Sequence, residues 1–525
     1  MAPWRTWGSD RGDREMDEAA TINLTPARRA MLMFSLLGAT IMVTLDLTIC
    51  NVAIPHMKAA LGATPDTISW VLTSYILTCA VATPMTGWLA GWIGRQRLFV
   101  IAVLGFTVAS AVCGLATTLP LMVFARLMQG LFGAFLLPIS QSSLYDLHSK
   151  EELVRALSLW GMGVLLAPIL GPVLGGWLTE TLNWRWVFFI NVPIGLATGA
   201  IAWFLMPKFH DLKRSFDVLG FLILVVMLSS LQLMLDRGTQ EDWFNSPEIL
   251  TELGLSIGGV WMIVIHLRQA RNAILPRGLF QDRNFVASLF LIFITGSIVA
   301  AGSAMVGPML QTLFGYPVIT AGMLMAPRAM GMMIPIMFAT RLLKLADPRT
   351  IIFLGMIAMG TSLWMMSGFT LQMDWKPVVI ASVIQGLGMG MITMPMNIIA
   401  ISTLDLRLRT DGSALYSLMR NIGGSIAIAI TSAMLARSMQ INHAELGARI
   451  TSGDIPIPFG GLPAGAGGQM VLGMADLEIA RQSMMIGYIN DYWMLMWAVL
   501  ILSPFALIMK PAPPDMAGEP MPIGE

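Results

Sequence analysis

Residues 30–53 read AMLMFSLLGATIMVTLDLTICNVA, a run that contains a single charged side chain, Asp46. About 20 apolar residues suffice for a helix to cross the hydrocarbon core of a bilayer, so this stretch predicts a transmembrane helix. Similar runs follow at about 68–89, 97–117, 120–145, 156–179, 186–206, 218–235, 250–267, 285–310, 317–340, 350–370, 378–402, 413–436 and 488–509. The sequence therefore predicts an all-α polytopic membrane protein with 14 transmembrane helices.

The composition excludes a soluble protein. Of the 525 residues, 56% are hydrophobic and 12% are charged, and the mean hydropathy is +0.71. A soluble chain is about a quarter charged, and one chain cannot hide so much apolar surface from water. Cys50, Cys79 and Cys113 all fall inside apolar runs, so we expect no disulfide framework. The polar first 28 residues do not resemble a cleaved signal peptide.

Basic residues are distributed unequally between the two sides of the predicted bundle. An even number of spans places both termini on one side, and a cytoplasmic N-terminus gives roughly three times as many Lys and Arg residues inside as outside, which obeys the positive-inside rule. We expect a multi-pass protein of the cytoplasmic (inner) membrane with both termini in the cytoplasm. The one long outside loop, 437–487, is rich in Gly and Pro and is either a spacer or a docking surface.

The two halves of the chain repeat one another. RLMQGLFGAFLLP begins at Arg126 and SVIQGLGMGMITMP at Ser382, and aligning Gln129 with Gln385 gives Gln-Gly-Leu in both, 256 residues apart. Such repeats place a substrate site at mid-membrane where the halves meet. The expected parts are an N-terminal tail (1–29), an N-terminal half (30–206), two inserted helices with flanking loops (207–284), a C-terminal half that includes the outside loop (285–509) and a C-terminal tail (510–525).

Four motifs resemble those of the major facilitator superfamily. They are LDLTICNVAIP (45–55), GWLAGWIGRQRLF (87–99), RLMQGLFGAFLLP (126–138) and APILGPVLGGW (167–177). The fourth is similar to the antiporter signature of drug:proton exporters, and SLQLMLDRGTQEDWF (230–244) narrows the match to EmrB/QacA-type exporters with 14 spans. The resemblance implies export of lipophilic or amphiphilic compounds, driven by the proton gradient without a cofactor. EmrB-type relatives also imply a periplasmic adaptor (membrane fusion) protein and an outer-membrane channel as partners.

Asp46 and Arg126 are the expected proton-coupling residues, and both match family positions. A carboxylate inside a span faces the bundle interior or a water-filled cavity, where it can bind and release a proton as its surroundings change. Arg126 lies at a similar depth and keeps its charge, so its approach would stabilise Asp46 after the proton leaves. The alternatives are a packing role for Asp46 and a snorkelling, interfacial Arg126.

Two motifs are expected to act in conformational change. The fourth motif permits close helix approach and a bend, and in relatives it resembles a packing seam between the halves; its residues are Pro168, Gly171, Pro172, Gly175 and Gly176. The second motif supplies Gly87, Gly94, Arg95 and Arg97, but Gly91 stands where the family has an acidic residue. Asp146 is the candidate to replace it by pairing with Arg95, and the alternative is that both charges are solvated.

Polar and aromatic side chains within the spans are candidates for the substrate cavity. Amides can bind a substrate or join helices, aromatic rings can hold lipophilic cations, and the 43 Met residues suggest an adaptable surface. The candidates are Asn51, Trp70, Tyr75, Gln129, Trp160, Gln311, Gln385, Asn397 and Arg420. Arg328 and Arg420 have no evident acidic partner, and snorkelling to the inner interface is the alternative for both.

Signatures of other function classes are not found in the sequence. There is no GxxxxGK[ST] loop for ATP, the five His residues lack metal-ligand spacing, and no paired carboxylates suggest an enzyme. We therefore expect no enzyme, no metal site and no nucleic-acid partner. The favoured function is proton-coupled multidrug efflux by alternating access, which confers drug resistance. The alternatives are a dedicated exporter of one metabolite, such as a fatty acid, siderophore or antibiotic, and a non-transporting receptor or scaffold.

Overall fold

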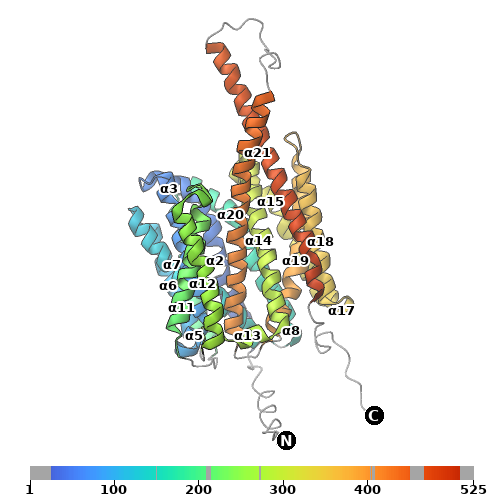
Figure 1. The fold of residues 1–525 in the computed structure, drawn as a ribbon. Helices are drawn as coiled ribbons and strands as arrows, with labels where there is room; N and C mark the ends of the chain where they lie inside the picture. The colour runs from blue at the N-terminus through green and yellow to red at the C-terminus, as the bar shows by residue number, and fades with distance from the viewer. Residues whose placement is uncertain are drawn as a thin grey trace, which may run out of the picture.

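The computed structural model describes residues 25–148, 150–207, 215–270, 273–402, 404, 408–449 and 466–508. These residues form a bundle of helices and contain no strand (Figure 1). Thirteen helical segments among them are long and apolar enough to cross a membrane. The remaining predicted span, 156–179, lies within α8 (Lys150–Thr181), a helix of 32 residues that is not among those thirteen. The all-α, polytopic fold is confirmed.

The N-terminal half is built on long helices with few breaks. Its longer helices are α2 (Pro26–Ala60), α4 (Trp70–Ala82), α5 (Thr86–Ile93), α6 (Arg95–Leu115), α7 (Leu119–Leu147), α8 and α10 (Asn191–Leu205), and α3 (Pro65–Ile68) and α9 (Trp186–Phe189) are single turns. α4 and α5 form one span that is interrupted by the 3-10 turn η1 (Thr83–Met85), where Pro84 lacks an amide donor. Gly94, with a φ of +90°, ends α5 and allows the sharp turn into α6.

The two inserted helices, α11 (Val218–Arg237) and α12 (Pro247–Gln269), pack on each other, and α11 also packs on α4 of the N-terminal half. A short turn, η2 (Trp243–Asn245), joins them. At their other end Asp217 accepts hydrogen bonds from the Gly220 amide at 2.9 Å, the Ile274 amide at 3.0 Å and His266 Nε2 at 2.8 Å. Burial raises the pKa of Asp217, but these hydrogen bonds outweigh it, so the pKa is lowered. The contact between Asp217 and His266 therefore joins the start of α11 to the end of α12.

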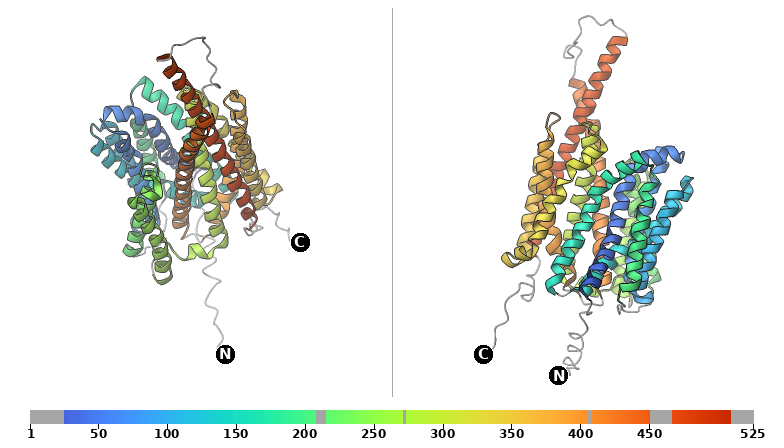
Figure 2. Two further views of the ribbon diagram at one scale, coloured as in Figure 1. Left: turned by 45° about the horizontal axis from the view of Figure 1, so that its top comes forward. Right: turned by 180° about the vertical axis from the view of Figure 1, so that it is seen from behind.

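The C-terminal half is likewise built mainly of long helices. Its helices are α13 (Gly278–Gln281), α14 (Arg283–Thr312), α15 (Val318–Met325), α16 (Pro327–Met337), α17 (Ala339–Leu345), α18 (Pro348–Ser367), α19 (Trp375–Ser402), α20 (Arg409–Arg449), α21 (Ala466–Leu502) and the 3-10 helix η4 (Ser503–Ile508). α15 and α16 form one span with a break at Ala326, directly before Pro327. The first residue of α2 and the last residue of η4 lie at the same end of the bundle (Figures 1 and 2).

The predicted outside loop 437–487 differs most from the structure. In its described part, residues 437–449 continue α20 and residues 466–487 belong to α21, while residues 450–465 lie outside the described part. The two helices run side by side and project from the bundle as a hairpin (Figures 1 and 2). The projecting parts of the two helices are polar, as in QINHAELGAR (440–449), so hydropathy alone did not predict that they are helical. We call the projecting residues, 437–449 and 466–480, the outer hairpin.

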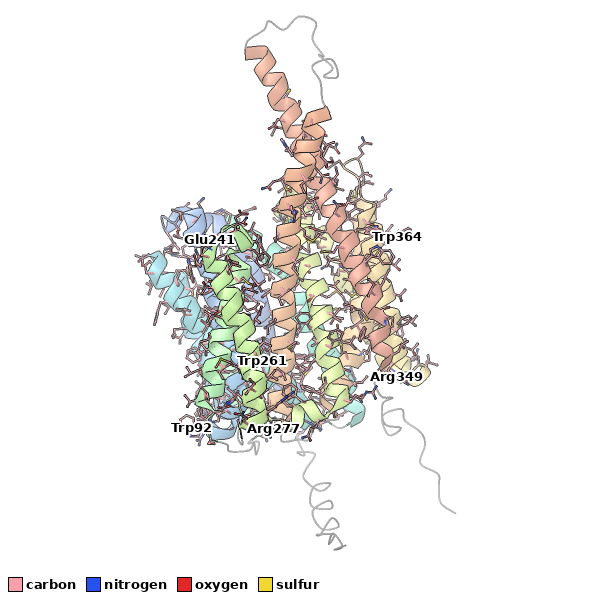
Figure 3. All side chains as sticks on the ribbon, viewed as in Figure 1. Trp92, Glu241, Trp261, Arg277, Arg349 and Trp364 are labelled. Carbon is pink, nitrogen blue, oxygen red and sulfur yellow. The ribbon has the colours of Figure 1, made fainter. Side chains whose placement is uncertain are left out.

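Apolar side chains cover the outside of the bundle. Trp261 of α12 and Trp364 of α18 are 69% and 63% exposed; both residues are labelled in Figure 3. So much exposed apolar surface is unfavourable in water and is expected where lipid surrounds the protein. A hollow of about 540 Å³ between α6 and α7 also lies on this outer surface and is lined by apolar side chains such as Val108, Phe124 and Phe132. It belongs to the lipid-facing surface rather than to the interior.

Candidate functional site

Asp46 and Arg126 form an ion pair inside the N-terminal half. Arg126 Nη1 donates to Asp46 Oδ2 at 2.5 Å, and both side chains are completely buried. The other carboxylate oxygen, Oδ1, accepts from Gln129 Nε2 at 2.8 Å and from Asn191 Nδ2 at 3.1 Å. Three N–H donors therefore surround the carboxylate, which suits its ionised form because that form only accepts hydrogen bonds.

Further contacts fix the guanidinium of Arg126 on α7. Its Nε donates to the Val71 carbonyl of α4 at 2.9 Å, and Nη1 also donates to Gln129 Oε1 at 2.8 Å. The guanidinium carbon lies 4.3 Å from the centre of the Tyr75 ring, a cation–π contact. Nη2 and the Tyr75 hydroxyl have no hydrogen-bond partner among the described residues. Arg126 thus joins α2, α4 and α7, and its Nη2 is left for another partner.

Asn191 is a member of this cluster that the sequence analysis missed. It is the first residue of α10, and its Nδ2 donates both to Asp46 and to Ser110 Oγ of α6. A polar amide inside the apolar run 186–206 was the available signal. Asp491 was also missed: it is 1% exposed on α21, and neither carboxylate oxygen has a hydrogen-bond partner in the described part of the chain. The predicted span 488–509 had placed it at the membrane edge, whereas α21 begins at Ala466.

The glycines of the fourth motif bring α8 close to α2. A Cβ atom added to Gly171 would lie 2.1 Å from Thr48 Oγ1, and one added to Gly175 would lie 3.0 Å from Ile49 Cγ1. Gly176 is buried as well, whereas the side chains of Pro168 and Pro172 lie outside the described part of the structure. The expected close approach is present. Gly171 and Gly175 contact α2, however, which belongs to the same half as α8, so these glycines do not lie at a seam between the halves.

Contact with the other half comes from a residue between those glycines. A Cβ atom on Gly322 of α15 would lie 2.6 Å from Val173 Cγ2 of α8. Gly171 and Gly175 therefore face α2, while Val173 between them faces α15, because a helix turns by about 100° per residue. α8 packs tightly on α2 and at the same time meets α15 and α16 of the C-terminal half.

Asp146 holds an ion cluster at the end of the bundle where α2 begins. Its Oδ2 accepts from Arg95 Nη1 at 2.5 Å, which is the pair predicted from the sequence. Its Oδ1 accepts from Arg409 Nη1 at 3.1 Å, a contact that the sequence analysis did not foresee. Arg95 belongs to the N-terminal half and Arg409 begins α20 of the C-terminal half, so one carboxylate connects the two halves. We call these three residues the inter-half latch.

Neighbouring contacts reinforce the latch. A Cβ atom on Gly87 would lie 1.8 Å from Asp411 Oδ1, so only glycine leaves room for this carboxylate of α20. The Tyr145 hydroxyl donates to the backbone carbonyl of Asn397 across the halves. Arg97 is exposed at this end. The second motif therefore brings Gly87 and Arg95 to the contact between the halves, but not Arg97.

The nine candidates for a substrate cavity do not form one cluster. Gln129 and Tyr75 belong to the Asp46 cluster, and Trp160 is buried and donates to Thr40 Oγ1 at 2.8 Å. Gln385 and Asn397 are buried on α19 of the other half, and Arg420 is half-buried against Gly296. Asn51, Trp70 and Gln311 are exposed, so they do not line a closed interior site in this structure.

Arg328 does not occupy the interfacial position that was the alternative for this residue. Its side chain is 3% exposed, and Nη1 donates to Ser303 Oγ of α14 at 2.8 Å. Nε and Nη2 have no hydrogen-bond partner in the described residues. Snorkelling is therefore wrong for Arg328, because a snorkelling side chain keeps its charged end at the interface.

Comparisons with known proteins agree with this architecture. The family model described as Major Facilitator Superfamily matches residues 36–428. The multidrug export protein EmrB of Haemophilus influenzae is 33% identical over 79% of this chain and 82% of its own length. EmrB of Escherichia coli K12 is 30% identical over 94% and 98%, and the fatty acid resistance protein FarB of Neisseria gonorrhoeae is 31% identical over 93% and 97%. The crystal structure of the human organic anion transporter MFSD10 (TETRAN) is similar with a TM-score of 0.55 at 11% identity, covering 91% of this chain and 100% of that one, which shows the fold alone.

Proposed function

The chain belongs to the major facilitator superfamily, and from this premise we propose that it exports lipophilic or amphiphilic compounds in exchange for protons. The observation that carries the proposal is the buried ion pair of Asp46 and Arg126. Buried charges in membrane helices are unfavourable unless paired, and they mark ion pathways. The names of the EmrB relatives support multidrug export as the direction and substrate class. Drug resistance would be the result of such export.

Proton binding at Asp46 would change how α2 and α7 fit together. A proton on the carboxylate removes its charge and leaves the buried guanidinium of Arg126 without a counter-charge. Arg126 would then keep its bonds to Val71 and Gln129 and its contact with Tyr75, but lose the attraction across to α2. Such a change of partner gives the two states of Asp46 different preferred helix positions, which is the requirement for coupling.

The conformational step would be alternating access by rocking of the two halves. The inter-half latch supports it, because Asp146 connects Arg95 of one half to Arg409 of the other. In the proposed cycle the latch holds the cytoplasmic end closed and breaks when the substrate site opens to the cytoplasm.

Substrate-driven proton release in proteoliposomes tests the coupling. Wild type, Asp46→Asn and a control, Asp374→Asn, which changes an exposed carboxylate, would be compared across lipophilic cations and anionic amphiphiles. We expect wild type and the control to release protons, and Asp46→Asn to bind substrate without releasing them. Equal proton release by all three proteins would refute Asp46 as the proton site. Binding without any dependence on the gradient would favour the receptor alternative.

We propose that the protein lies in the inner membrane with both termini in the cytoplasm. Arg277 and Arg349 lie at the end of the bundle where α2 begins, and Glu241 lies at the other end (Figure 3). Basic residues are enriched on the cytoplasmic side of membrane proteins, which supports this orientation. Reporter fusions at either terminus would be active only in a cytoplasmic assay if the orientation is correct.

The outer hairpin supports an accessory partner outside the membrane. α20 has 41 residues, whereas about 20 suffice to cross the bilayer, so it is long enough to continue beyond the bundle as residues 437–449. Met470, Met474 and Leu477 on α21 are 63%, 58% and 72% exposed, and their spacing places them on one face of the helix. We propose a periplasmic adaptor, itself joined to an outer-membrane channel, as the partner. Crosslinking from Met474→Cys in native membranes should capture an adaptor, and its absence there would oppose the proposal.

Export of one dedicated metabolite is the second candidate. The name of the FarB relative, a fatty acid resistance protein, favours a fatty acid. A substrate panel separates the two functions, because a polyspecific exporter accepts many unrelated cations and a dedicated exporter accepts one compound.

A further inference from the structure

The C-terminal half contains a buried cation without a counter-charge. Arg328 of α16 is bound to the protein through Nη1 alone, which donates to Ser303 Oγ. No carboxylate forms an ion pair with it among the residues that the structure describes; the buried carboxylate of Asp491, on α21, has no hydrogen-bond partner there either. The guanidinium remains charged in proteins, and a buried unpaired charge is strongly unfavourable. The site is therefore incomplete without an anion.

Comparison with the Asp46 cluster shows which group is lacking. The offset of 256 residues relates Gln129 to Gln385, and Asp46 to Gly302, the neighbour of Ser303. Asp46 and Ser303 each stand 20 residues after the first residue of their helix, α2 and α14. Ser303 thus stands about as far along α14 as Asp46 stands along α2. The C-terminal half has a buried arginine on a different helix, α16, and no acid at this position of α14.

The other groups around Arg328 also have free hydrogen-bonding capacity. Gln385 is 1% exposed, and its Nε2 would lie 3.2 Å from a Cβ atom on Gly302, while its Oε1 has no partner in the described residues. The Ser382 hydroxyl, one turn earlier on α19, is buried and also lacks a partner there. A Cβ atom on Gly386 would lie 2.0 Å from the Arg328 carbonyl, so α16 and α19 are in direct contact at this point. Arg328, Gln385 and Ser303 therefore belong to one buried polar site.

The free edge of Arg328 indicates the shape of the ligand group. Nε and Nη2 lie on the same side of the guanidinium, and their two N–H bonds are parallel, which matches the two oxygens of a carboxylate. The helices that supply the site are rich in buried apolar side chains, among them Met305 on α14, two residues after Ser303, and Met332 on α16, one turn after Arg328. An anionic head group on an apolar chain fits both features.

We propose that Arg328, with Ser303 and Gln385, binds the carboxylate of an amphiphilic substrate in the C-terminal half. This assignment rests on the proposed export function for its physiological role, but not for the binding itself. The carboxylate supplies the negative charge that Asp46 supplies in the first half. α16 also contacts α8, so separation of the halves at this contact would give the substrate access to the site.

Equilibrium binding to the purified protein in lipid nanodiscs tests the proposal. The probes are dodecanoate, its uncharged methyl ester, and dodecyltrimethylammonium as a cation with the same chain. We expect wild type to bind dodecanoate more tightly than the ester, and Arg328→Gln to weaken dodecanoate binding by about 10- to 100-fold, the effect of losing hydrogen bonds to a charged group. Binding of the ester and the cation should stay within about twofold, because neither can use the guanidinium.

Two further variants keep the test decisive if Arg328→Gln does not fold. Arg328→Lys retains the charge but removes the two-donor edge, so we expect weaker binding of dodecanoate alone. Ser303→Asp places a carboxylate opposite Arg328, as in the first half, and should raise the unfolding temperature while it abolishes dodecanoate binding.

An equal loss of all three probes in Arg328→Gln and Arg328→Lys would overturn the assignment and indicate a structural arginine. Equal affinity of wild type for dodecanoate and its ester would overturn it as well. Proton coupling is measured separately, with dodecyltrimethylammonium in proteoliposomes. Its absence in wild type would refute the proposed function and leave the carboxylate site intact.

Discussion

Asp46 and Arg126 neutralise each other in the dry interior of the N-terminal half, and each has further partners that hold it in place. The interior has no water to solvate either charge, so the pair is stable only while both members are present. A single proton on Asp46 would therefore leave the charge of Arg126 buried without a counter-charge. Arg328 represents the opposite situation, because among the described residues no carboxylate pairs with its charge and its Nε and Nη2 have no hydrogen-bond partner.

The first prediction concerns the stability of this pair. Asp46→Asn and Arg126→Gln should each lower the free energy of unfolding by about 3–5 kcal/mol, because each leaves one buried charge uncompensated. The double variant should recover most of the loss, since it removes both charges. Thermal unfolding in detergent, followed by tryptophan fluorescence, measures all three variants. Additive losses in the double variant would contradict the coupling.

At the scale of helices, glycine determines how closely α8 approaches α2. Gly171 faces Thr48 with no room for a Cβ atom, whereas Gly161 on the same helix has no atom within 4 Å of that position. The two glycines have the same chemistry and differ in their surroundings. They therefore form a matched pair for testing close packing.

The second prediction uses this pair. Gly171→Ala should lower the unfolding temperature, because the added methyl group overlaps Thr48 and pushes the helices apart. Gly161→Ala should be neutral or stabilising by up to about 1 kcal/mol, because alanine favours a helix. Equal effects of the two substitutions on the unfolding temperature would show that the α2–α8 contact tolerates a larger spacing.

The third prediction concerns the two inserted helices and pH. The folded-state pKa of Asp217 lies below its unfolded value of about 3.9. The carboxylate therefore contributes stability above pH of about 4, and that contribution is lost as the pH falls through the folded-state pKa. We expect wild type to lose unfolding temperature below pH of about 4 more steeply than Asp217→Asn. Parallel pH profiles would show that the contacts with Gly220 and His266 do not stabilise the charged form.

At the scale of the molecule, the two halves are joined where Asp146 binds Arg95 and Arg409. Tyr145 and Asn397 add a neutral hydrogen bond there. A protein that rocks its halves needs contacts of this kind that are strong enough to define a state and few enough to break.

The fourth prediction is that Asp146→Asn shifts the protein toward conformations open at this end. Loss of charge-assisted hydrogen bonds worth about 1.5–3 kcal/mol would change the population ratio by about 10- to 100-fold. Spin labels at the exposed positions Trp92 and Arg341, one in each half, should report longer distances. Asp374→Asn serves as the control, and unchanged distances in Asp146→Asn would show that the latch does not hold the closed state.

The sequence alone determined the membrane class and nearly all the helices, and it made Asp46 the candidate proton site, because the bilayer imposes long apolar runs and makes any charge within them stand out. It also indicated the Arg95–Asp146 pair, since an unmatched basic loop needs an acid nearby. Only the tertiary structure decided that Asn191 completes the Asp46 cluster, that Arg409 joins the latch, and that Arg328 is buried without a carboxylate. These facts depend on which faces of distant helices meet, and hydropathy records how apolar a helix is but not which way each side chain points.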